Sequence, residues 1–360
     1  MENESSKKPS LGNSKAIMRQ GITLSSQELI RRYYIDTERK IPLVLEPAID
    51  GVDLITWSRN NRETIENDLL ECGAILFRNF KLGTVTEFEQ FVRTISPDLL
   101  EYRERSSPRH RVSGLIYTST DYPSHQSIFL HNENSYAHTW PLKIFFFCVT
   151  PATEGGETPI ADVRRIFSRI SPQVREKFIQ KKVLYVRNFT EGLGLSWQTV
   201  YQNDDPAVVE ALFREAGYEV EWIGRHSLRT RRVGQAVAKH PVSGKMLWFN
   251  HATFFHITTF EPRIQKALLE ACGEEGLPNN TYYGDGSSIE PETLDQLRDA
   301  YNQETVKFLW KQGDILLLDN MSVAHGRSPY TGDRKVVVGM SEAFNCERLS
   351  AVGGSNNGAD

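Results

Sequence analysis

Hydrophobic positions along this chain of 360 residues gather in short apolar runs, separated by polar segments that carry helix signals. Runs of this length that are rich in Val, Ile, Leu and Phe predict buried strands. They occupy 74–80, 142–150, 181–189, 245–250, 314–320 and 335–344. The polar sequence "HPVSGK", just before the 245–250 run, predicts a hairpin turn.

Helix signals recur between these runs. A helical pattern at 61–73 stops at Gly73, and four more segments place Pro at the first helical position, where its missing N–H costs nothing. These four begin at Ser171, Asp205, Glu261 and Glu290. Strands and helices do not alternate strictly, so the pattern predicts a mainly β protein with helical decorations. A jelly-roll core, or double-stranded β-helix, is the expected fold.

One domain is the simplest organisation, since no long linker or internal repeat interrupts the chain. We expect a single jelly-roll domain over 26–349, with a helical insertion around 190–300. Residues 1–25 and 350–360 are rich in small and polar residues, which predicts a disordered tail at each end.

Composition excludes several classes of function. A net charge of −4 and a pI near 6.2 give no electrostatic footprint for nucleic acid. The chain has no apolar run of the roughly 18 residues that a membrane span needs, and its N-terminus has no signal-peptide core. Its four cysteines are scattered, which is typical of reduced thiols in a cytoplasmic protein.

The sequence "FLHNENSY" raises the first chemical possibility. If His131 and Glu133 lie on one strand, their side chains point to the same face, because strand side chains alternate. With 9 His and 46 acidic residues in the chain, about one His-x-Asp/Glu is expected by chance. The pair alone therefore indicates nothing, and a polar strand end explains it equally well.

A second histidine, His325, makes a metal site formed with His131 and Glu133 more plausible than the pair alone does. It follows the apolar run 314–320 and enters a turn that contains Gly326. Two imidazoles and one carboxylate form the facial triad of non-haem Fe(II) oxygenases, which leaves other coordination positions open. A zinc hydrolase with the same ligand types is an alternative, although its usual His-Glu-x-x-His helix is absent.

Two further residues suit a 2-oxo acid cosubstrate. Arg334 opens the last apolar run, and a guanidinium binds a carboxylate through a planar fork. Thr158, in "GGETPIAD", offers a hydroxyl to the same carboxylate. Taken singly, Arg334 is explained as a surface residue beside Asp333, and "GGET" as a turn.

In their order along the chain, these motifs resemble the taurine dioxygenase-like Fe(II)/2-oxoglutarate oxygenases. The resemblance runs from about residue 35 to 345 and includes "GAILFRNF" at 73–80. It implies that His131, Glu133 and His325 bind Fe(II), that Thr158 and Arg334 hold 2-oxoglutarate, and that O2 is the oxidant. Glu in the triad is similar to the clavaminate synthase-like branch. "HNENSYAHTWPLKIFFF", "ETPIAD" and "WFNHATFFH" look closest to the syringomycin-type amino acid hydroxylases of nonribosomal peptide clusters.

The resemblance implies hydroxylation of an unactivated C–H bond, with desaturation or cyclisation as minor outcomes. Halogenating relatives carry a small residue in place of the carboxylate, and Glu133 fills that position here. An alternative of another class is a catalytically silent jelly-roll binding module. Such a module is expected to have lost a triad residue, and all three are present.

The substrate is less well defined. Family members that take small anions carry a second Arg four residues after the cosubstrate Arg, and this chain has Val338 there. That departure suits a masked carboxyl, such as an aminoacyl group tethered to a peptidyl carrier protein and oxidised at its β-carbon. A free polar amino acid, such as arginine, is the runner-up. Asn250 is the candidate substrate contact. A basic segment at 224–234 either binds an acidic carrier or is a solvated loop. This segment contains Arg225, Arg229, Arg231 and Arg232.

Overall fold

The computed structural model describes residues 28–345 and 347, apart from 102–108, 191 and 225–226. Both predicted tails lie outside these residues. Within them, Cys72, Cys148 and Cys272 are free thiols. The described part of the chain contains no helix that is both long and apolar enough to cross a membrane.

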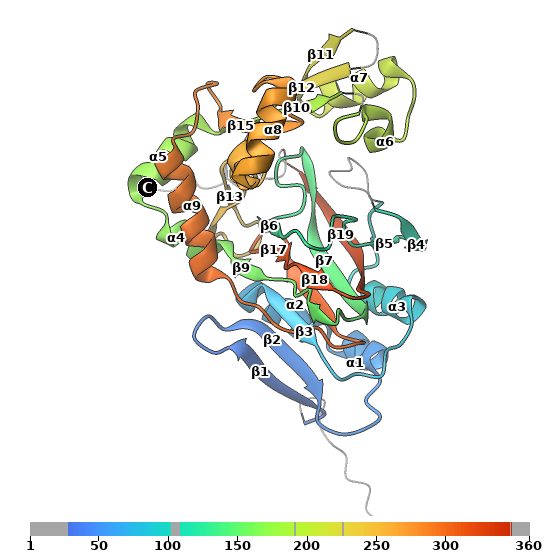
Figure 1. The fold of residues 1–360 in the computed structure, drawn as a ribbon. Coiled ribbons are helices and arrows are strands. Elements are labelled where there is room, and N and C mark those ends of the chain that lie inside the picture. The colour runs from blue at the N-terminus through green and yellow to red at the C-terminus, as the bar shows by residue number, and fades with distance from the viewer. Residues whose placement is uncertain (1–27, 102–108, 191, 225–226, 346, 348–360) are drawn as a thin grey trace, which may run out of the picture.

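A large, mostly antiparallel sheet forms one wall of the core (Figure 1). Only its pair β2–β3 runs parallel among the described strands. Its strands, in spatial order, are β1 (Ile30–Asp36), β2 (Ile41–Pro47), β3 (Ala74–Phe77), β16 (Ile315–Asp319), β7 (Thr139–Thr150), β19 (Lys335–Asn345), β5 (Ile116–Thr118) and β4 (Arg111–Ser113). The runs predicted at 74–80, 142–150, 314–320 and 335–344 are therefore strands of this sheet.

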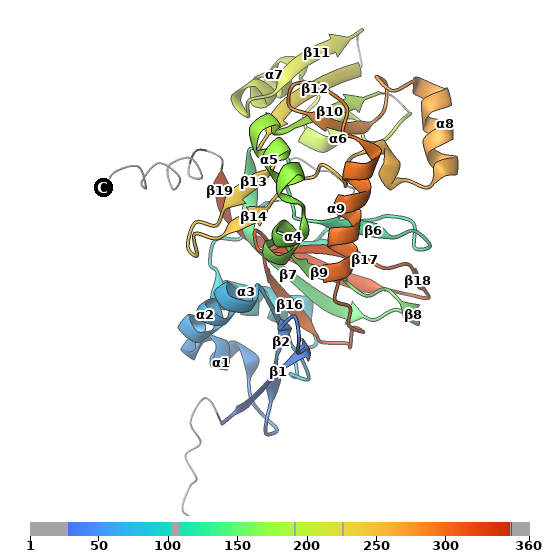
Figure 2. The same ribbon diagram turned by 90° about the vertical axis from the view of Figure 1, so that its left-hand side faces the viewer.

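Both faces of the central strands β3, β16, β7 and β19 are buried, which explains why these strands read as unbroken apolar runs. On β7, Phe145 and Phe147 pack with the helices of one face, whereas Ile144, Phe146 and Cys148 pack toward the interior. The helices are α1 (Leu54–Asn60), α2 (Arg62–Cys72) and α3 (Val85–Ile95). Figure 2 shows them together on one side of the large sheet.

A small sheet covers the other face and carries the chemistry. Its strands, in order, are β6 (Ile128–His131), β17 (Val323–Arg327) and β9 (Ile160–Asp162). Val323 of β17 and Ile160 of β9 join the interior cluster of the large sheet. The hairpin-like pair β8 (Glu154–Gly155) and β18 (Tyr330–Thr331) lies beside it. Two facing sheets of this kind confirm the predicted jelly-roll core.

The rest of the chain covers one end and one side of the core (Figure 1). The four Pro-led helices are confirmed, and each begins at the predicted proline. They are α5 (Pro172–Lys181), α7 (Pro206–Glu215), α8 (Pro262–Cys272) and α9 (Pro291–Glu304). Two shorter helices, α4 (Val163–Arg169) and α6 (Trp197–Tyr201), and a single 3-10 turn, η1 (Ile257–Thr259), accompany them.

The segment 190–300, predicted as a helical insertion, also contains strands. A four-stranded sheet joins β11 (Glu219–Ile223), β12 (Ser227–Gly234), β10 (Val183–Phe189) and β15 (Asn279–Tyr283) in that order. The predicted hairpin at "HPVSGK" is present as β13 (Val237–Lys239) and β14 (Met246–Trp248). The boundaries of the predicted domain, 26–349, stay a prediction.

Candidate active site

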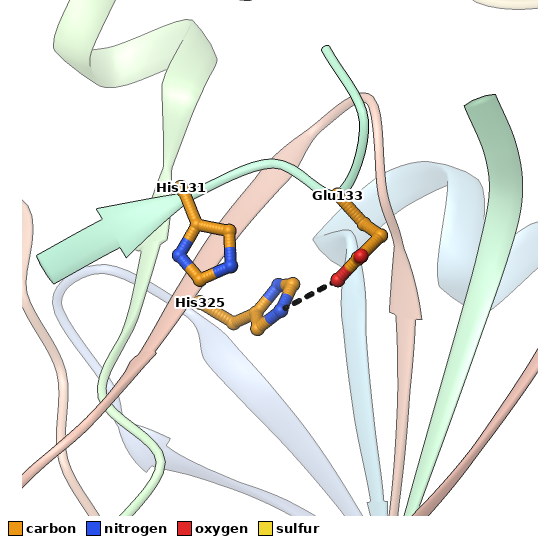
Figure 3. Close-up of side chains that lie close together, drawn as sticks. All are labelled: His131, Glu133 and His325. Atoms are coloured by element: carbon orange, nitrogen blue, oxygen red, sulfur yellow. Dashed lines mark ion pairs between the residues drawn. The ribbon is translucent and has the colours of Figure 1, made fainter. Parts of the chain in front are cut away.

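The three candidate metal ligands meet at one end of the small sheet. His131 is the last residue of β6, and His325 lies opposite it on β17 in register. Glu133 follows β6, and Figure 3 shows its carboxylate directed at the two imidazole rings. One ligand atom from each residue lies within 4.8 Å of the other two. The His325 Nε2 to Glu133 Oε2 distance is 3.9 Å. The structure thus brings together three residues of which two, His131 and His325, are 194 positions apart in the sequence.

Glu133 reaches this position from a turn, and strand alternation does not place it. β6 ends at His131, so the sequence argument from alternating side chains does not hold for the carboxylate. Asn320 places it instead: its Oδ1 accepts from the Glu133 N–H at 2.7 Å, and its Nδ2 donates to the Glu133 carbonyl at 2.9 Å. His325 also differs from expectation, because it lies within β17 and the preceding turn is at 319–322.

Local contacts orient both imidazoles. The Nδ1 of His131 lies 2.9 Å from the Phe129 carbonyl, to which it donates, so its Nε2 is left as an acceptor for a cation. Its ring stacks on Phe254 at 4.5 Å between centroids. The ring of His325 packs on Phe146 of the large sheet at 5.1 Å. These aromatic contacts leave each imidazole little freedom to turn away.

Electrostatics keep the two histidines in the form that binds a metal. Burial lowers the pKa of His131, and Glu133 only partly offsets this effect. Burial, followed by the neighbouring His131 and Arg109, lowers the pKa of His325 well below its usual range. Both rings are then neutral at physiological pH. Arg109 donates to the Glu133 carboxylate at 2.8 Å, which compensates this buried anion.

A narrow cavity connects the histidines with the two residues predicted to hold the cosubstrate. We call it the first cavity; His131, His325, Thr158, Arg327 and Arg334 are among its lining residues. The Nε of Arg334 donates to the Gly156 carbonyl at 2.8 Å, which fixes the direction of its guanidinium fork. The residues predicted from the sequence to bind the metal and those predicted to bind the cosubstrate therefore line the same cavity.

The first cavity has an excess of buried positive charge. Burial, and then the charge of Arg327, lowers the pKa of Arg334 to about 10, so its side chain stays cationic at neutral pH. Burial also lowers the pKa of Arg327. Neither forms an ion pair with a carboxylate of the described residues. Arg327 donates to the carbonyls of Tyr122, Pro123 and Gln126, whereas the Nε of Arg334 donates to one carbonyl, that of Gly156. Positive charge without a carboxylate partner beside a cavity calls for an anion, and a carboxylate of the cosubstrate matches that need.

Thr158 is prepared to donate to such an anion. It is 3% exposed, and its Oγ1 accepts from the indole Nε1 of Trp310 at 3.1 Å. Because the hydroxyl already accepts one hydrogen bond, its own O–H is free to point into the cavity. Trp310 was not singled out from the sequence, and its distance of 152 positions from Thr158 left no local signal.

A second cavity of about 190 Å³ also borders His131. It shares His131, Arg109, Thr120 and Ile128 with the first cavity. Most of its remaining wall is aromatic or neutral polar; it consists of Tyr122, Ser127, Phe129, Phe254, Phe255, Thr259, Phe260 and Asn279. Such a cavity beside a metal triad is where a substrate would meet the open coordination positions.

The other predicted contacts lie elsewhere. Asn250 donates to the Ala236 carbonyl at 2.6 Å and accepts from the Ala252 N–H at 2.9 Å, and it lines neither cavity. Its amide holds a turn, so the predicted substrate contact gains no support. Val338 is buried on β19 among the interior residues. No cation therefore stands at the position that small anionic substrates would use.

The basic segment is a structured strand. Arg229, Arg231 and Arg232 lie on β12, and Arg225 lies outside the described residues. Arg232 is buried and donates to the Tyr136 carbonyl at 2.7 Å. Arg231 pairs with Glu221 at 2.9 Å, and Arg229 donates to Asn188 at 2.9 Å. Arg232 is therefore occupied within the protein, and the three described arginines lie on a strand and not in a solvated loop. Arg231 is 37% exposed, and a carrier interface at this segment stays a prediction.

The chain matches the model of the taurine catabolism dioxygenase TauD, TfdA family over residues 38–340. It therefore belongs to this family. The predicted class, a 2-oxoglutarate-dependent non-haem iron dioxygenase that uses Fe(II), is confirmed. The site fits that metal, because two neutral imidazoles and one carboxylate lie together and two cavities border His131.

Individual relatives agree with this placement. The chain is 38% identical over 307 residues to the dapdiamide synthesis protein DdaC of Enterobacter agglomerans, covering 82% of this chain and 93% of that protein. It is 26% identical over 322 residues to a clavaminate synthase-like protein of Arabidopsis thaliana, covering 84% and 94%. These matches confirm the predicted clavaminate synthase-like branch.

Solved structures share the fold. PvcB of Pseudomonas aeruginosa superposes with a TM-score of 0.53 at 14% identity, covering 90% of this chain and 94% of that chain. AAD-2, solved with Mn(II) and N-oxalylglycine, gives a TM-score of 0.50 at 13% identity, covering 88% and 98%.

Proposed function

We propose that this dioxygenase hydroxylates an unactivated C–H bond, at the β-carbon, of an amino acid or of a carrier-tethered aminoacyl group in secondary metabolism. The tethered form is the preferred substrate. The observation that carries the proposal is the arrangement of two cavities around His131: one rich in buried cations and one rich in aromatic side chains.

In this proposal His131, Glu133 and His325 hold Fe(II), and Arg334 and Thr158 hold 2-oxoglutarate in the first cavity. Bound Fe(II) with 2-oxoglutarate supplies the activation of O2, with succinate and carbon dioxide as by-products. Arg334 presents its fork to the far carboxylate, and Thr158 donates its O–H to the same group. Thr158 is buried and Arg334 is half-buried, which limits the access of water to these contacts and strengthens them.

The second cavity supports an aminoacyl substrate. Its phenyl rings, among them Phe254, Phe255 and Phe260, favour an apolar or flat group, and Ser127, Thr259 and Asn279 offer neutral hydrogen bonds. A free carboxylate needs a cation, but position 338 offers only a buried Val, and Arg109 of the second cavity is paired with Glu133. A thioester carbonyl has no such need. The relative named for dapdiamide synthesis supports a place in secondary metabolism.

The test compares free amino acids with the same residues loaded on a peptidyl carrier protein, each with Fe(II), 2-oxoglutarate and O2. We expect products heavier by one oxygen atom, with higher yield from the carrier-bound form. Efficient turnover of a free polar amino acid such as arginine, with no gain from the carrier, would exclude the tethered substrate and favour the runner-up. A silent binding module would form no succinate with any member of the panel.

A further inference from the structure

The segment that connects β5 with β6, residues 119–127, borders both cavities, and we call it the wall segment. Ser119 and Thr120 line the first cavity, and Thr120, Tyr122 and Ser127 line the second. The wall segment contains no helix or strand, and most of its residues are exposed. Its position beside the cavities therefore depends on contacts with the rest of the fold.

The end of β17 and the turn after it hold the wall segment by four hydrogen bonds. Arg327, the last residue of β17, is 5% exposed. Its guanidinium donates to three carbonyls of the wall segment, at 2.9, 2.6 and 2.9 Å; they belong to Tyr122, Pro123 and Gln126. The N–H of Tyr330 donates to a fourth, that of Ser124, at 2.9 Å. The stretch between His325 and Arg334 thus also fixes a wall of the second cavity.

Arg327 and Arg334 share the ring of Tyr330. Their Cζ atoms lie 5.2 and 5.6 Å from the centre of this ring, and the Cζ of Arg327 lies 5.7 Å from the centre of the Tyr122 ring. A guanidinium is attracted to an aromatic ring at such distances. The contacts form a continuous row of side chains from Arg334, in the first cavity, to Tyr122, in the second.

An anion in the first cavity acts on Arg327 as well as on Arg334, because both residues line that cavity. The positive charge of Arg327 opposes that of Arg334. In the described part of the chain, the buried Nε of Arg327 has no hydrogen-bond partner. An anion that binds Arg334 reduces the repulsion between the two cations and attracts Arg327. It therefore favours the position of Arg327 in which the guanidinium holds the wall segment.

We propose that Arg327 is a positioning residue that couples the two cavities. 2-Oxoglutarate in the first cavity stabilises Arg327, Arg327 holds the wall segment, and the wall segment gives the second cavity the shape that positions the substrate. This inference rests on the part of the proposed function that places 2-oxoglutarate beside Arg334, and it does not depend on which amino acid is oxidised.

Amide hydrogen exchange, followed by mass spectrometry, measures this coupling without turnover. Wild-type protein with Mn(II) is compared with and without saturating 2-oxoglutarate. We expect the cosubstrate to slow exchange in the wall segment by about fivefold or more, the lower end of the usual coupling between two sites. Peptides from α3, which packs on the other face of the large sheet, are the internal control and should be unchanged.

Two variants separate the contacts that carry the coupling. Arg327→Met removes the charge and three hydrogen bonds, so the wall segment should exchange faster than in wild type and gain no protection from 2-oxoglutarate. If Arg327 were only structural, exchange would be faster but 2-oxoglutarate would still protect. Tyr330→Leu keeps all four hydrogen bonds, since its own comes from the main chain. It removes the ring between the guanidiniums, so exchange without 2-oxoglutarate should match wild type and protection should be smaller.

The balance of products gives a second measurement. Both variants should form more succinate per hydroxylated product than wild-type enzyme, because a substrate beside a loosened wall is less well positioned. Arg93→Ala, which alters an exposed ion pair on α3, should keep the wild-type ratio.

Binding of 2-oxoglutarate is checked separately by the charge-transfer band with Fe(II) in the absence of oxygen. Equal exchange of the wild-type wall segment with and without 2-oxoglutarate, while the band is present, overturns the inference and leaves the proposed function intact. Full protection in Arg327→Met, or in Tyr330→Leu if Arg327→Met does not fold, overturns it as well. If folded Arg327→Met forms no band at any concentration of 2-oxoglutarate, Arg327 is a cosubstrate ligand and the positioning role is wrong. Unchanged 2-oxoglutarate affinity in Arg334→Ala instead overturns the placement of the cosubstrate, and the inference with it.

Discussion

The side chain of Asn320 and the main chain of Glu133 form a reciprocal amide pair. Asn320 accepts from the Glu133 N–H at 2.7 Å and donates to the Glu133 carbonyl at 2.9 Å. Asn320 itself stands between β16 and β17, five residues before His325, and its N–H donates to the Leu142 carbonyl at 2.8 Å. One turn thus fixes the carboxylate of the triad and also leads to its second histidine.

Replacing Asn320 should therefore disturb both stability and the metal site. Asn320→Ala removes three side-chain hydrogen bonds, two to Glu133 and one to the Pro141 carbonyl, at a fully buried position. We expect a loss of about 2–4 kcal/mol in the free energy of unfolding, since buried partners are left unsatisfied. Urea unfolding measures this loss, and Mn(II) titration should show weaker binding because Glu133 is no longer held.

Asn250→Ala is the matched control. Asn250 is also a buried amide that bonds only to nearby backbone groups in the described structure, but it lies away from the triad. It should lose stability while keeping the Mn(II) affinity of the wild-type protein. Equal Mn(II) binding by Asn320→Ala and wild type would contradict the role of the amide pair. A raised substrate KM in Asn250→Ala would restore the original assignment of Asn250.

The triad itself gives the second prediction. His131→Ala, Glu133→Ala and His325→Ala should each abolish succinate formation, because each removes one of three proposed ligands. Wild-type protein with Fe(II) and 2-oxoglutarate without oxygen should develop a weak visible charge-transfer band, and the three variants should not. Circular dichroism checks that they remain folded. Substantial succinate formation by a folded His325→Ala protein would contradict the assignment.

The sequence predicted the parts of the site that have local signals. His131, Thr158, His325 and Arg334 each lie in or beside an apolar run that is a strand of the jelly roll. Arg109 was missed because it is 24 positions from Glu133 and lies in no recognisable motif. Contacts of this kind arise only when the edge of the large sheet folds over the small one.

The positive charge of β12 led to its prediction as a basic surface segment, whereas the structure shows a strand. Its residues read as a basic segment, yet Arg232 is buried and Val233 is 47% exposed, which inverts the usual pattern. The buried guanidinium is tolerated because the Tyr136 carbonyl accepts from it and the ring of Tyr218 lies 5.7 Å away. A strand stabilised by such specific contacts gives no hydrophobic alternation to detect. The Pro-led helices were found because a helix start is encoded locally.

The third prediction concerns the cosubstrate. Arg334→Ala should raise the requirement for 2-oxoglutarate by roughly 30- to 150-fold, the equivalent of about 2–3 kcal/mol for a lost charge-assisted hydrogen bond. Trp310→Phe removes only the donor that orients the Thr158 hydroxyl, so we expect a smaller rise, on the order of a few-fold. Steady-state KM values for 2-oxoglutarate measure both effects.

An exposed arginine supplies the control for these variants. Arg93 pairs with Glu89 on the surface of α3, and Arg93→Ala should leave the KM for 2-oxoglutarate unchanged. If Arg334→Ala keeps the wild-type requirement, 2-oxoglutarate does not bind through this residue. If Trp310→Phe has a larger effect than Thr158→Val, the indole acts by another route than the threonine hydroxyl.

The fourth prediction is a pH dependence of stability that comes from His256. Its Nδ1 accepts from the Thr258 N–H at 3.2 Å at the start of η1, and Arg298 stands nearby. Burial, and then the charge of Arg298, lowers the pKa of His256 from 6.5 to about 4. The unfolded chain therefore binds the proton at a higher pH than the folded protein does. Stability from this group rises with pH between about 4 and 6.5, and it is lost as the pH falls through that window.

His256→Asn isolates the effect, because Asn keeps the accepting group at the start of the 3-10 turn but does not titrate. The free energies of unfolding of the two proteins should differ by a constant above pH 7. As the pH falls from 7.5 to 5, wild-type protein should lose about 1–2 kcal/mol relative to the variant. Urea unfolding at pH 7.5, 6 and 5 measures this difference. Parallel pH profiles would mean that His256 protonates in the folded protein as readily as in the unfolded chain, which its burial, its hydrogen bond from the Thr258 N–H and the charge of Arg298 oppose.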